Sequence, residues 1–407
     1  MAARDLKRGL DASLERPRVR RRFLLVNLPY GPFGREFATA LRSRGGDVGH
    51  MIFNAGDVIS RRGPGGIEYR GAVADWPATY RALAPHWTDV VIYGEGRWQT
   101  RPVLETAGSH PRVWILENGY FRPDWVTLER DGVAAASSVL PRSAEGYAGH
   151  AVDAPEPDPV GSVTRPLVMA VARYWLAERF LPIYSRPDSG FEPPPWRQAV
   201  GHARRWLKLR LGKPVNAGEV IGQGPFVLVC LQREGDSQLT RHSALTTNAA
   251  FLDAVLSDFA RNAPQRLRLV VKNHPLDPAV IDQSASTRTI AKRHGVADRV
   301  SFIDGGAMAA LCRASCGLVV NNSSAALAAL GFGTPVKVLG RAFFDFEGLT
   351  HQGPLASFWT RPLGPDTELF LRFRSAVIAR TQINGSFEGP RLRRRTAERI
   401  AERMIAA

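Results

Sequence analysis

The chain of 407 residues is 44% hydrophobic and 23% charged, with a formal net charge of +16. Its length predicts two domains of about 150–200 residues each, and its composition is that of a globular protein. No apolar run reaches the roughly 18 residues that span a bilayer, and no signal-peptide segment is present, so we expect a cytoplasmic protein. Three cysteines exclude a disulfide framework and predict small buried thiols at Cys230, Cys312 and Cys316.

The first half of the chain alternates strands and helices. An apolar strand at 23–29 runs into a Gly/Pro turn and a helix, and further strands are expected at 48–53, 89–93 and 112–116. Proline clusters after Gly149 mark loops and linkers. We therefore expect an N-terminal Rossmann-like domain over residues 20–160, followed by a Pro-rich and basic linker or helical segment over residues 161–220.

The second half repeats this alternation, and three of its apolar strands end in polar residues. The first strand is followed by Gln232 and residues 236–238, the second ends in residues 272–275, and the third ends in residues 321–324. Such alternation predicts parallel strands with right-handed crossovers, whose carboxyl ends converge on one ligand cleft. We expect a C-terminal Rossmann-like domain over residues 221–360 and a helical tail over residues 361–407.

Two α/β domains facing a central cleft, with a C-terminal helix returning across them, form the GT-B architecture of glycosyltransferases. Other two-domain α/β enzymes fit the same order of elements. The sequence lacks a P-loop, a GxSxG nucleophile elbow and a complete GxGxxG fingerprint. Nucleoside-triphosphate hydrolysis, serine-hydrolase chemistry and dinucleotide binding are therefore poorly supported.

The turn at 321–324, Asn-Asn-Ser-Ser, lies between a strand and an Ala-rich helix. The first turn of a helix offers free N–H groups to an anion, so the turn is a candidate phosphate site. Ser and Asn are also ordinary helix N-caps, and this simpler reading stays open.

Basic residues gather at 18–22, 196–214 and 391–395, and the second cluster is mixed with Trp and Leu. A solvated basic face, an anionic membrane surface and a nucleic acid are three possible explanations. No helix-turn-helix, zinc-finger or RNP-like pattern supports nucleic acid. Residues 166–184 predict a buried helix or an interdomain segment.

Many short segments, in order, resemble the bacterial capsular polysaccharide biosynthesis/export proteins, a group of β-Kdo glycosyltransferases. They include QREGDSQ (232–238), KNHPLDP (272–278) and VLGRAFFDFEGLTHQGPLASFW (338–359), and, in the first half, FNAGD (53–57) and ENGYFRPDWVTLERDGV (117–133). The resemblance covers roughly residues 23–360. The single module is similar to the member that places the first Kdo on a lipid.

The resemblance implies an inverting transfer of Kdo from CMP-Kdo to a (lyso)phosphatidylglycerol-type acceptor, which starts a poly-Kdo linker. It implies no cofactor and no metal. It also implies an acceptor-side N-terminal domain and a donor C-terminal domain. Expected partners are the CMP-sugar, the lipid, the anionic inner-membrane surface and other capsule assembly or export proteins, with no nucleic acid. The protein is expected to be cytoplasmic and peripherally associated with the inner membrane.

The donor is doubly anionic, because Kdo carries a carboxylate and CMP a phosphate. Cationic groups, N–H donors and a helix start suit such a ligand. The resemblance implies a donor site made of Gln232, Ser237, Gln238, Lys272, His274, Pro275, Asn322, Ser323, Ser324 and Arg341. Taken alone, a His that follows a strand more often makes a structural hydrogen bond.

An inverting transfer needs a base that deprotonates the acceptor hydroxyl. Asp236 is the first candidate, although an Asp in such a turn often caps it. Glu117 and Glu95, which follow apolar strands of the first half, are alternatives, and Asp57 is a weaker one. Asn27 and Gly31 complete the predicted acceptor side.

One position departs from the common pattern of nucleotide-sugar transferases. Ala328 stands where many of them carry a ribose-binding Glu, so ribose recognition must come from elsewhere. Two further functions stay open beside the Kdo transferase. One is a non-catalytic scaffold in the capsule export assembly, and the other is a surface-polysaccharide transferase that uses another nucleotide sugar.

Overall fold

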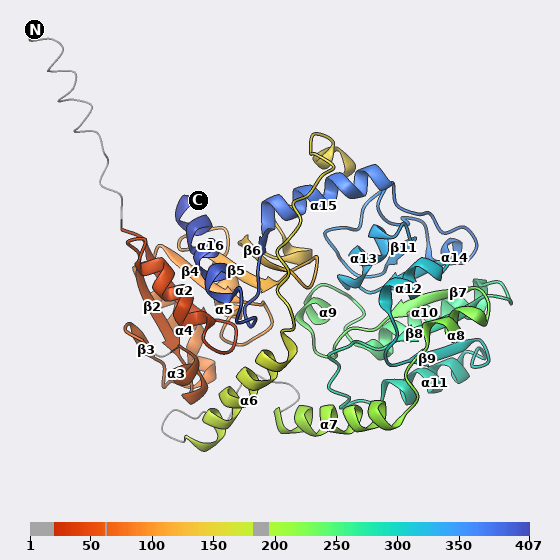
Figure 1. Ribbon diagram of the computed structural model, residues 1–407, viewed down its shortest axis with the longest axis horizontal. Coiled ribbons are helices and arrows are strands. Elements are labelled where there is room, and N and C mark those ends of the chain that lie inside the picture. Colours follow the sequence, from red (N-terminus) through yellow and green to blue (C-terminus); the bar gives the residue numbers. More distant parts are fainter. Residues whose placement is uncertain (1–19, 62, 182–194) are drawn as a thin grey trace, which may run out of the picture.

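The computed structural model describes residues 20–61, 63–181 and 195–407, and its strands form two sheets (Figure 1). The first sheet contains β1 (Arg22–Asn27), β2 (Asp47–Ile52), β3 (Gly66–Glu68), β4 (Asp89–Tyr93), β5 (Arg112–Asn118), β6 (Trp125–Arg130) and β12 (Gln382–Asn384). The second contains β7 (Phe226–Cys230), β8 (Arg268–Lys272), β9 (Val300–Ile303), β10 (Gly317–Val320) and β11 (Val336–Val338).

Helices surround both sheets. Those of the first half are α2 (Phe33–Arg42), α3 (Ala55–Arg61), α4 (Trp76–Leu83) and α5 (Arg101–Leu104). Two long helices, α6 (Thr164–Phe180) and α7 (Pro195–Leu211), follow them. The others are α8 (Ala217–Gly222), α9 (Ser237–Arg241), α10 (Asn248–Asn262), α11 (Gln283–Arg293), α12 (Met308–Ala314), α13 (Ala325–Gly331), α14 (Leu355–Phe358), α15 (Thr367–Thr381) and α16 (Arg393–Ala406).

Both sheets have the Rossmann order of strands. The second sheet runs β9-β8-β7-β10-β11 and is parallel throughout. The first contains the same order as β3-β2-β1-β4-β5, extended by β6, which is antiparallel to β5, and by β12, which is antiparallel to β6. In such sheets a ligand binds where the strand order reverses, between β1 and β4 in one half and between β7 and β10 in the other. The two-domain GT-B fold predicted from the sequence is confirmed.

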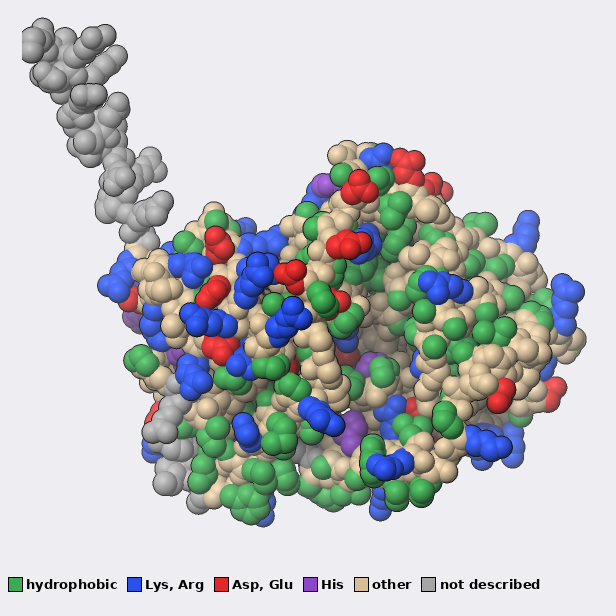
Figure 2. All heavy atoms as spheres, in the orientation of Figure 1, with side chains coloured by type: hydrophobic (Ala, Val, Ile, Leu, Met, Phe, Trp, Pro, Cys, Tyr) green, Lys and Arg blue, Asp and Glu red, His purple; other side chains and the backbone are tan. Residues whose placement is uncertain are grey.

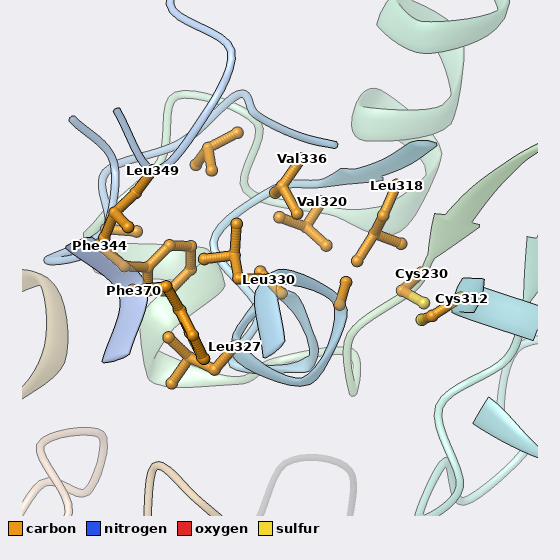
Figure 3. Close-up of a cluster of buried hydrophobic side chains, with 14 of the residues drawn as sticks. Cys230, Cys312, Leu318, Val320, Leu327, Leu330, Val336, Phe344, Leu349 and Phe370 are labelled. Carbon is orange, nitrogen blue, oxygen red and sulfur yellow. The ribbon is translucent and has the colours of Figure 1, made fainter. Parts of the chain in front are cut away.

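The strands are apolar because helices cover both faces of each sheet. Along β1, Phe23 and Leu25 pack beneath α2 and α16, whereas Leu24 and Val26 face the aromatic cluster of Trp76. In the second sheet, side chains of β7, β10 and β11 point into a core that α13 and α15 complete. Figure 3 shows this core, including Leu318, Val320, Leu327, Val336 and Phe370. Its buried apolar contacts fix the strand register on which the loops depend.

The thiols differ in their surroundings. Cys230 and Cys312 lie together in that core (Figure 3), and burial raises the pKa of Cys230 to about 12. Cys316 is exposed, so the prediction of a buried thiol was wrong at this position. It lies between Ser315, which caps the end of α12, and the first residue of β10.

The chain returns to its first half at the C-terminus, as predicted. After α15, the short strand β12 pairs with β6, and α16 packs against α2 (Figure 1). Arg393 anchors α16 through two hydrogen bonds to Glu36, at 2.8 and 2.9 Å. Residues about 350 positions apart in the sequence thus share one core.

Helix α6 is only partly buried. Tyr174 and Ala177 are buried, and the Tyr174 hydroxyl bonds Asn54 and Asp57 at α3, while Phe180 on the same helix is 67% exposed. Of the two sequence-based readings of this segment, a buried helix or an interdomain segment, the first is wrong for the described residues, because α6 buries one face and leaves Val168 and Met169 on the other exposed. Helix α6 lies between the two halves of the chain (Figure 1), as the second reading expects. No helix in the described part of the chain is both long and apolar enough to cross a bilayer.

Candidate functional site

Loops at the carboxyl ends of the two sheets meet at a cleft between the halves. Figure 2 shows the molecule hollowed there, with acidic, basic and histidine side chains inside the hollow. The loop after β4 touches α9: Nε2 of His242 lies 3.1 Å from Oε2 of Glu95, and Arg241 donates to the Glu95 carbonyl at 2.9 Å. At Gly96 the approach is so close that a Cβ would lie 3.0 Å from that of Ser237.

Glu117 is the most strongly perturbed acid of this cleft. It lies at the end of β5, and its Oε1 accepts a hydrogen bond from the Asn118 N–H at 2.9 Å. The pKa of Glu117 is raised to about 7, mainly by burial and in part by the nearby carboxylates of Asp236 and Glu95, against the opposing effects of the Asn118 hydrogen bond and of Arg122. At neutral pH the carboxyl group is therefore poised to accept or release a proton.

Asp236, the first candidate for the base, caps α9. Its Oδ1 accepts a hydrogen bond from the Gln238 N–H at 2.8 Å. The turn-capping role that the sequence also allowed is therefore present. Its carboxylate is nevertheless close enough to raise the pKa of Glu117, so the two candidates from different halves of the chain share one site.

His274 lies at the end of β8 and is neutral. Burial, and after it the positive charges of Arg122, Arg233, Arg205 and Lys272, together lower its pKa to about 4. Its Nδ1 accepts a hydrogen bond from the Leu276 N–H at 3.1 Å, which assigns the ring proton to Nε2. His274 can thus serve as a hydrogen-bond donor but not as a cation.

Two arginines near His274 were not singled out from the sequence, although both fall inside segments that carried the resemblance. Arg122, on the loop between β5 and β6, influences both Glu117 and His274. Arg233, on the loop after β7, bonds Gln198 of α7 at 2.7 Å. Their contribution depends on loops from both halves facing each other, which no local pattern in the sequence reveals.

The amides at the strand-order reversal of the second sheet bond one another. Gln232 donates to Asn322 at 2.9 Å, and Asn322 donates in turn to the Gln238 carbonyl at 2.7 Å. Asn321 is buried and donates to the Leu245 carbonyl at 2.8 Å. These contacts hold the turn at 321–324 to its neighbouring segments, including α9. The side chains of Gln232, Asn321 and Asn322 therefore stabilise the loops of the site.

The serines of that turn are less buried. Ser323 accepts a bond from the Ala325 N–H at 3.3 Å, and Ser324 begins α13 without a side-chain capping bond. The Arg341 side chain is exposed, and its backbone N–H bonds the His242 carbonyl at 2.9 Å.

Lys272 and Pro275, two residues of the predicted donor site, bond groups on neighbouring segments. Its buried ammonium group donates to the Gly305 carbonyl at 2.7 Å, beside Cys230 and Cys312. The carbonyl of Pro275 accepts from Arg205 at 2.8 Å. Both residues therefore stabilise the loops around His274.

Three predicted acceptor-side residues have structural partners in the first half. Asn27 donates to the Tyr93 carbonyl at 3.1 Å, between β1 and β4. Gly31 has a positive φ of 85° and lies against Ala170 of α6. Asp57 is buried and accepts from the Phe53 N–H at 3.0 Å and from the Tyr174 hydroxyl at 3.2 Å. Asp57 thus holds α3 to α6.

Capsule polysaccharide proteins are similar to this chain over most of its length. A model of the family "Capsule polysaccharide biosynthesis protein" matches residues 88–388. The chain is 32% identical over 388 residues to the capsule polysaccharide modification protein LipB of Neisseria meningitidis serogroup B, covering 89% of this chain and 91% of LipB. It is 29% identical over 382 residues to the capsule polysaccharide export protein KpsS of Escherichia coli, covering 90% of this chain and 97% of KpsS.

Among solved structures, the chain is similar to KpsC of Thermosulfurimonas dismutans, a beta Kdo 2,7 transferase. The TM-score is 0.43 at 14% identity, covering 95% of this chain and 99% of KpsC. The family match spans loops of both halves, including those that carry Glu117, Asp236 and His274. The chain belongs to the capsule polysaccharide biosynthesis protein family.

Proposed function

We propose that this protein is a glycosyltransferase of capsule polysaccharide biosynthesis that transfers Kdo from CMP-Kdo to a phosphatidylglycerol-type lipid, without a metal cofactor. The observation that carries the proposal is Glu117, a partly exposed carboxyl group at the domain cleft with a pKa of about 7. A group that removes a proton at neutral pH works best with a pKa near that pH.

Glu117 takes the role of the base in place of Asp236. Its carboxylate would accept the proton of the acceptor hydroxyl as that oxygen attacks the sugar. Asp236 already accepts the capping bond of α9, and its negative charge helps to raise the pKa of Glu117. Asp236 therefore acts as a positioning and tuning residue.

The donor would bind between His274 and the two arginines. Negative charge grows on the CMP phosphate as its bond to the sugar breaks, and a fixed N–H donor stabilises such charge. The Nε2–H of His274 suits this role because the ring stays neutral. Arg122 and Arg233 supply positive charge for the Kdo carboxylate and the phosphate.

Because several carboxyl groups lie close together in the cleft, a second reaction mechanism, double displacement, is also possible. If one carboxylate attacks the sugar and a second displacement follows, the configuration of the sugar is retained, whereas a single displacement inverts it. The sequence-based prediction is inversion. NMR assignment of the product's anomeric configuration distinguishes the two routes, and trapping of a sugar–protein adduct by mass spectrometry would support retention.

The reaction would take place at the cytoplasmic face of the inner membrane, where a water-soluble donor can meet a lipid acceptor. The assay supplies CMP-Kdo, regenerated in situ, and a fluorescent phosphatidylglycerol analogue. We expect product from the wild type and a loss of at least about a hundredfold in Glu117→Gln and in His274→Ala.

Glu129→Gln is the matched control. Glu129 is a second acid with a pKa of about 7, but Tyr120 and Ser137 occupy its two carboxylate oxygens. Equal loss of activity in this variant would argue against a specific role of Glu117. Absence of product from the wild type with CMP-Kdo, but turnover with another nucleotide sugar, would reassign the donor. Neither turnover nor CMP binding would favour the scaffold role.

A further inference from the structure

Helix α7 carries an apolar stripe on the side that faces away from the protein. Trp196, Val200, Leu207 and Leu211 follow one another at helical spacing, and all are exposed, Leu211 to 78%. The opposite side of the helix makes the contacts: Gly201 lies against the Pro278 carbonyl. A helix of a globular protein normally turns its apolar stripe to the core, so this reversed orientation indicates a partner outside the chain.

Helix α6 has a similar outward face. Met169, Leu176 and Phe180 lie on one side of it and are exposed, whereas Tyr174 and Ala177 are buried against the first half. Both helices run along one edge of the molecule (Figure 1), and apolar and basic side chains gather along that edge in Figure 2. We call the exposed apolar residues of α6 and α7, with the basic residues beside them, the docking face.

The charge of the docking face is positive. Arg165, Arg173 and Arg179 are exposed on α6, and α7 exposes Arg197, Arg204, Lys208 and Arg210. Between residues 195 and 211 there is no acidic residue. Two arginines lie over exposed rings, Arg197 at 5.5 Å from Trp196 and Arg210 at 5.0 Å from Trp206. Trp beside Arg and Lys is the composition of helices that lie in a membrane interface.

Arg205 is not part of this face, although it belongs to the same basic cluster in the sequence. Its side chain is 10% exposed and bonds both oxygens of Asp304, at 2.6 and 2.9 Å. It also donates to the carbonyls of His274, Pro275 and Asp277, at distances of 2.8 to 3.1 Å. Helix α7 therefore holds the His274 loop with the side opposite to its apolar stripe.

We infer that the docking face binds the surface of an anionic phospholipid bilayer, with α6 and α7 lying in the plane of the interface. The apolar stripe would enter the headgroup region, and the flanking Arg and Lys would contact lipid phosphates. The inference rests on the proposed function and deepens it. The inference identifies the side of the molecule that faces the membrane. In this orientation α7 lies between the lipid surface and the loop of His274.

The test measures vesicle binding by co-sedimentation, with the full chain and without any sugar donor. Vesicles of pure phosphatidylcholine are compared with vesicles that also contain phosphatidylglycerol. We expect the wild type to bind the anionic vesicles and to bind neutral vesicles far more weakly. Because no turnover is measured, failure of this inference and failure of the proposed function remain distinguishable.

Two triple variants probe the face. One removes charge, Arg204→Gln with Lys208→Gln and Arg210→Gln, and the other removes apolar surface, Val200→Gln with Leu207→Gln and Leu211→Gln. All six side chains are exposed, and Gln is a good helix former, so both variants should fold, which thermal melting checks. Each should lower partitioning to anionic vesicles by roughly one to two orders of magnitude.

Matched controls make the same kinds of change elsewhere. Their sites are exposed basic residues, Arg261, Arg266 and Lys292, and exposed apolar residues, Val139, Leu363 and Leu371. We expect both control triples to bind like the wild type. Unchanged binding in the two docking-face variants, or equal loss in the controls, would overturn the inference. So would a wild type that ignores vesicles but changes its oligomeric state when the apolar stripe is removed, since that result identifies a protein interface.

Discussion

The imidazole of His242 and the carboxylate of Glu95, 3.1 Å apart, join the two halves of the molecule directly beside Glu117. Both residues are buried, and the second carboxylate oxygen of Glu95 accepts from the Val133 N–H at 3.3 Å. This contact between the two halves therefore also places a negative group next to the candidate base. Glu95 therefore both joins the two halves and raises the pKa of Glu117.

Replacing Glu95 by Ala should destabilise the protein. The change leaves the His242 ring and the Val133 N–H without their partner, and each unsatisfied buried group costs about 1–3 kcal/mol. We expect the free energy of unfolding to fall by roughly 2–4 kcal/mol, measured by denaturant titration. Glu105→Ala, at an exposed salt bridge with Arg81, should change it by less than about 1 kcal/mol. Equal effects at the two sites would contradict the buried contact.

The activity should depend on pH through Glu117. A base works only when deprotonated, and burial raises its pKa to about 7. We therefore expect kcat/KM to fall on the acidic side of about pH 7, tenfold for each further pH unit. The measurement is a pH–rate profile with saturating regeneration of the donor. A profile that stays flat down to pH 5 would exclude Glu117 as the base.

Stability should also respond to the same group. A Glu with its usual pKa of 4.5 releases its proton in the unfolded chain, but Glu117 keeps it up to about pH 7 in the folded chain. Folding stability therefore falls as pH rises through this window. Glu117→Gln should be more stable than the wild type by about 1–3 kcal/mol at pH 8 and similar to it near pH 4. The exposed substitution Glu105→Gln should show no such pH-dependent gain.

Asp236 can be separated from Glu117 by its capping role. Asn is as good an N-cap as Asp, whereas Ala loses about 1 kcal/mol of helix stability. We expect the Asp236→Asn variant to keep most of the transferase activity and the wild-type melting temperature. The Asp236→Ala variant should have a lower melting temperature. If Asp236→Asn is as inactive as Glu117→Gln, the base assignment returns to Asp236.

Arg122 should influence the protonation of both Glu117 and His274. Its charge lowers the pKa of Glu117 and that of His274. Arg122→Gln should therefore raise both pKa values, which shifts the acidic limb of the pH–rate profile upward and moves the His274 titration observed by NMR. Neutralising the exposed Arg261 is the control, and it should leave both titrations in place. A shift in KM alone would restrict Arg122 to binding.

The sequence by itself determined the two sheets and the loops that carry the site. Apolar runs such as 226–231 and 267–271, each followed by polar residues, specify buried parallel strands whose ends face one edge, because a strand covered on both faces needs apolar residues on both. The resemblance in the same loops indicated the family. These properties follow from local pattern, so they could be read before any contact was known.

Only the tertiary structure decided what the side chains at those strand ends do. Lys272 bonds Gly305, and Asn321 and Asn322 bond neighbouring loops. Arg205 is partly buried and bonds the His274 carbonyl, while Arg204 is exposed. The pKa of Glu117 depends on burial and on charges that reach it from the other half of the chain. Side-chain direction and desolvation arise from contacts between segments far apart in the sequence, and no local pattern encodes them.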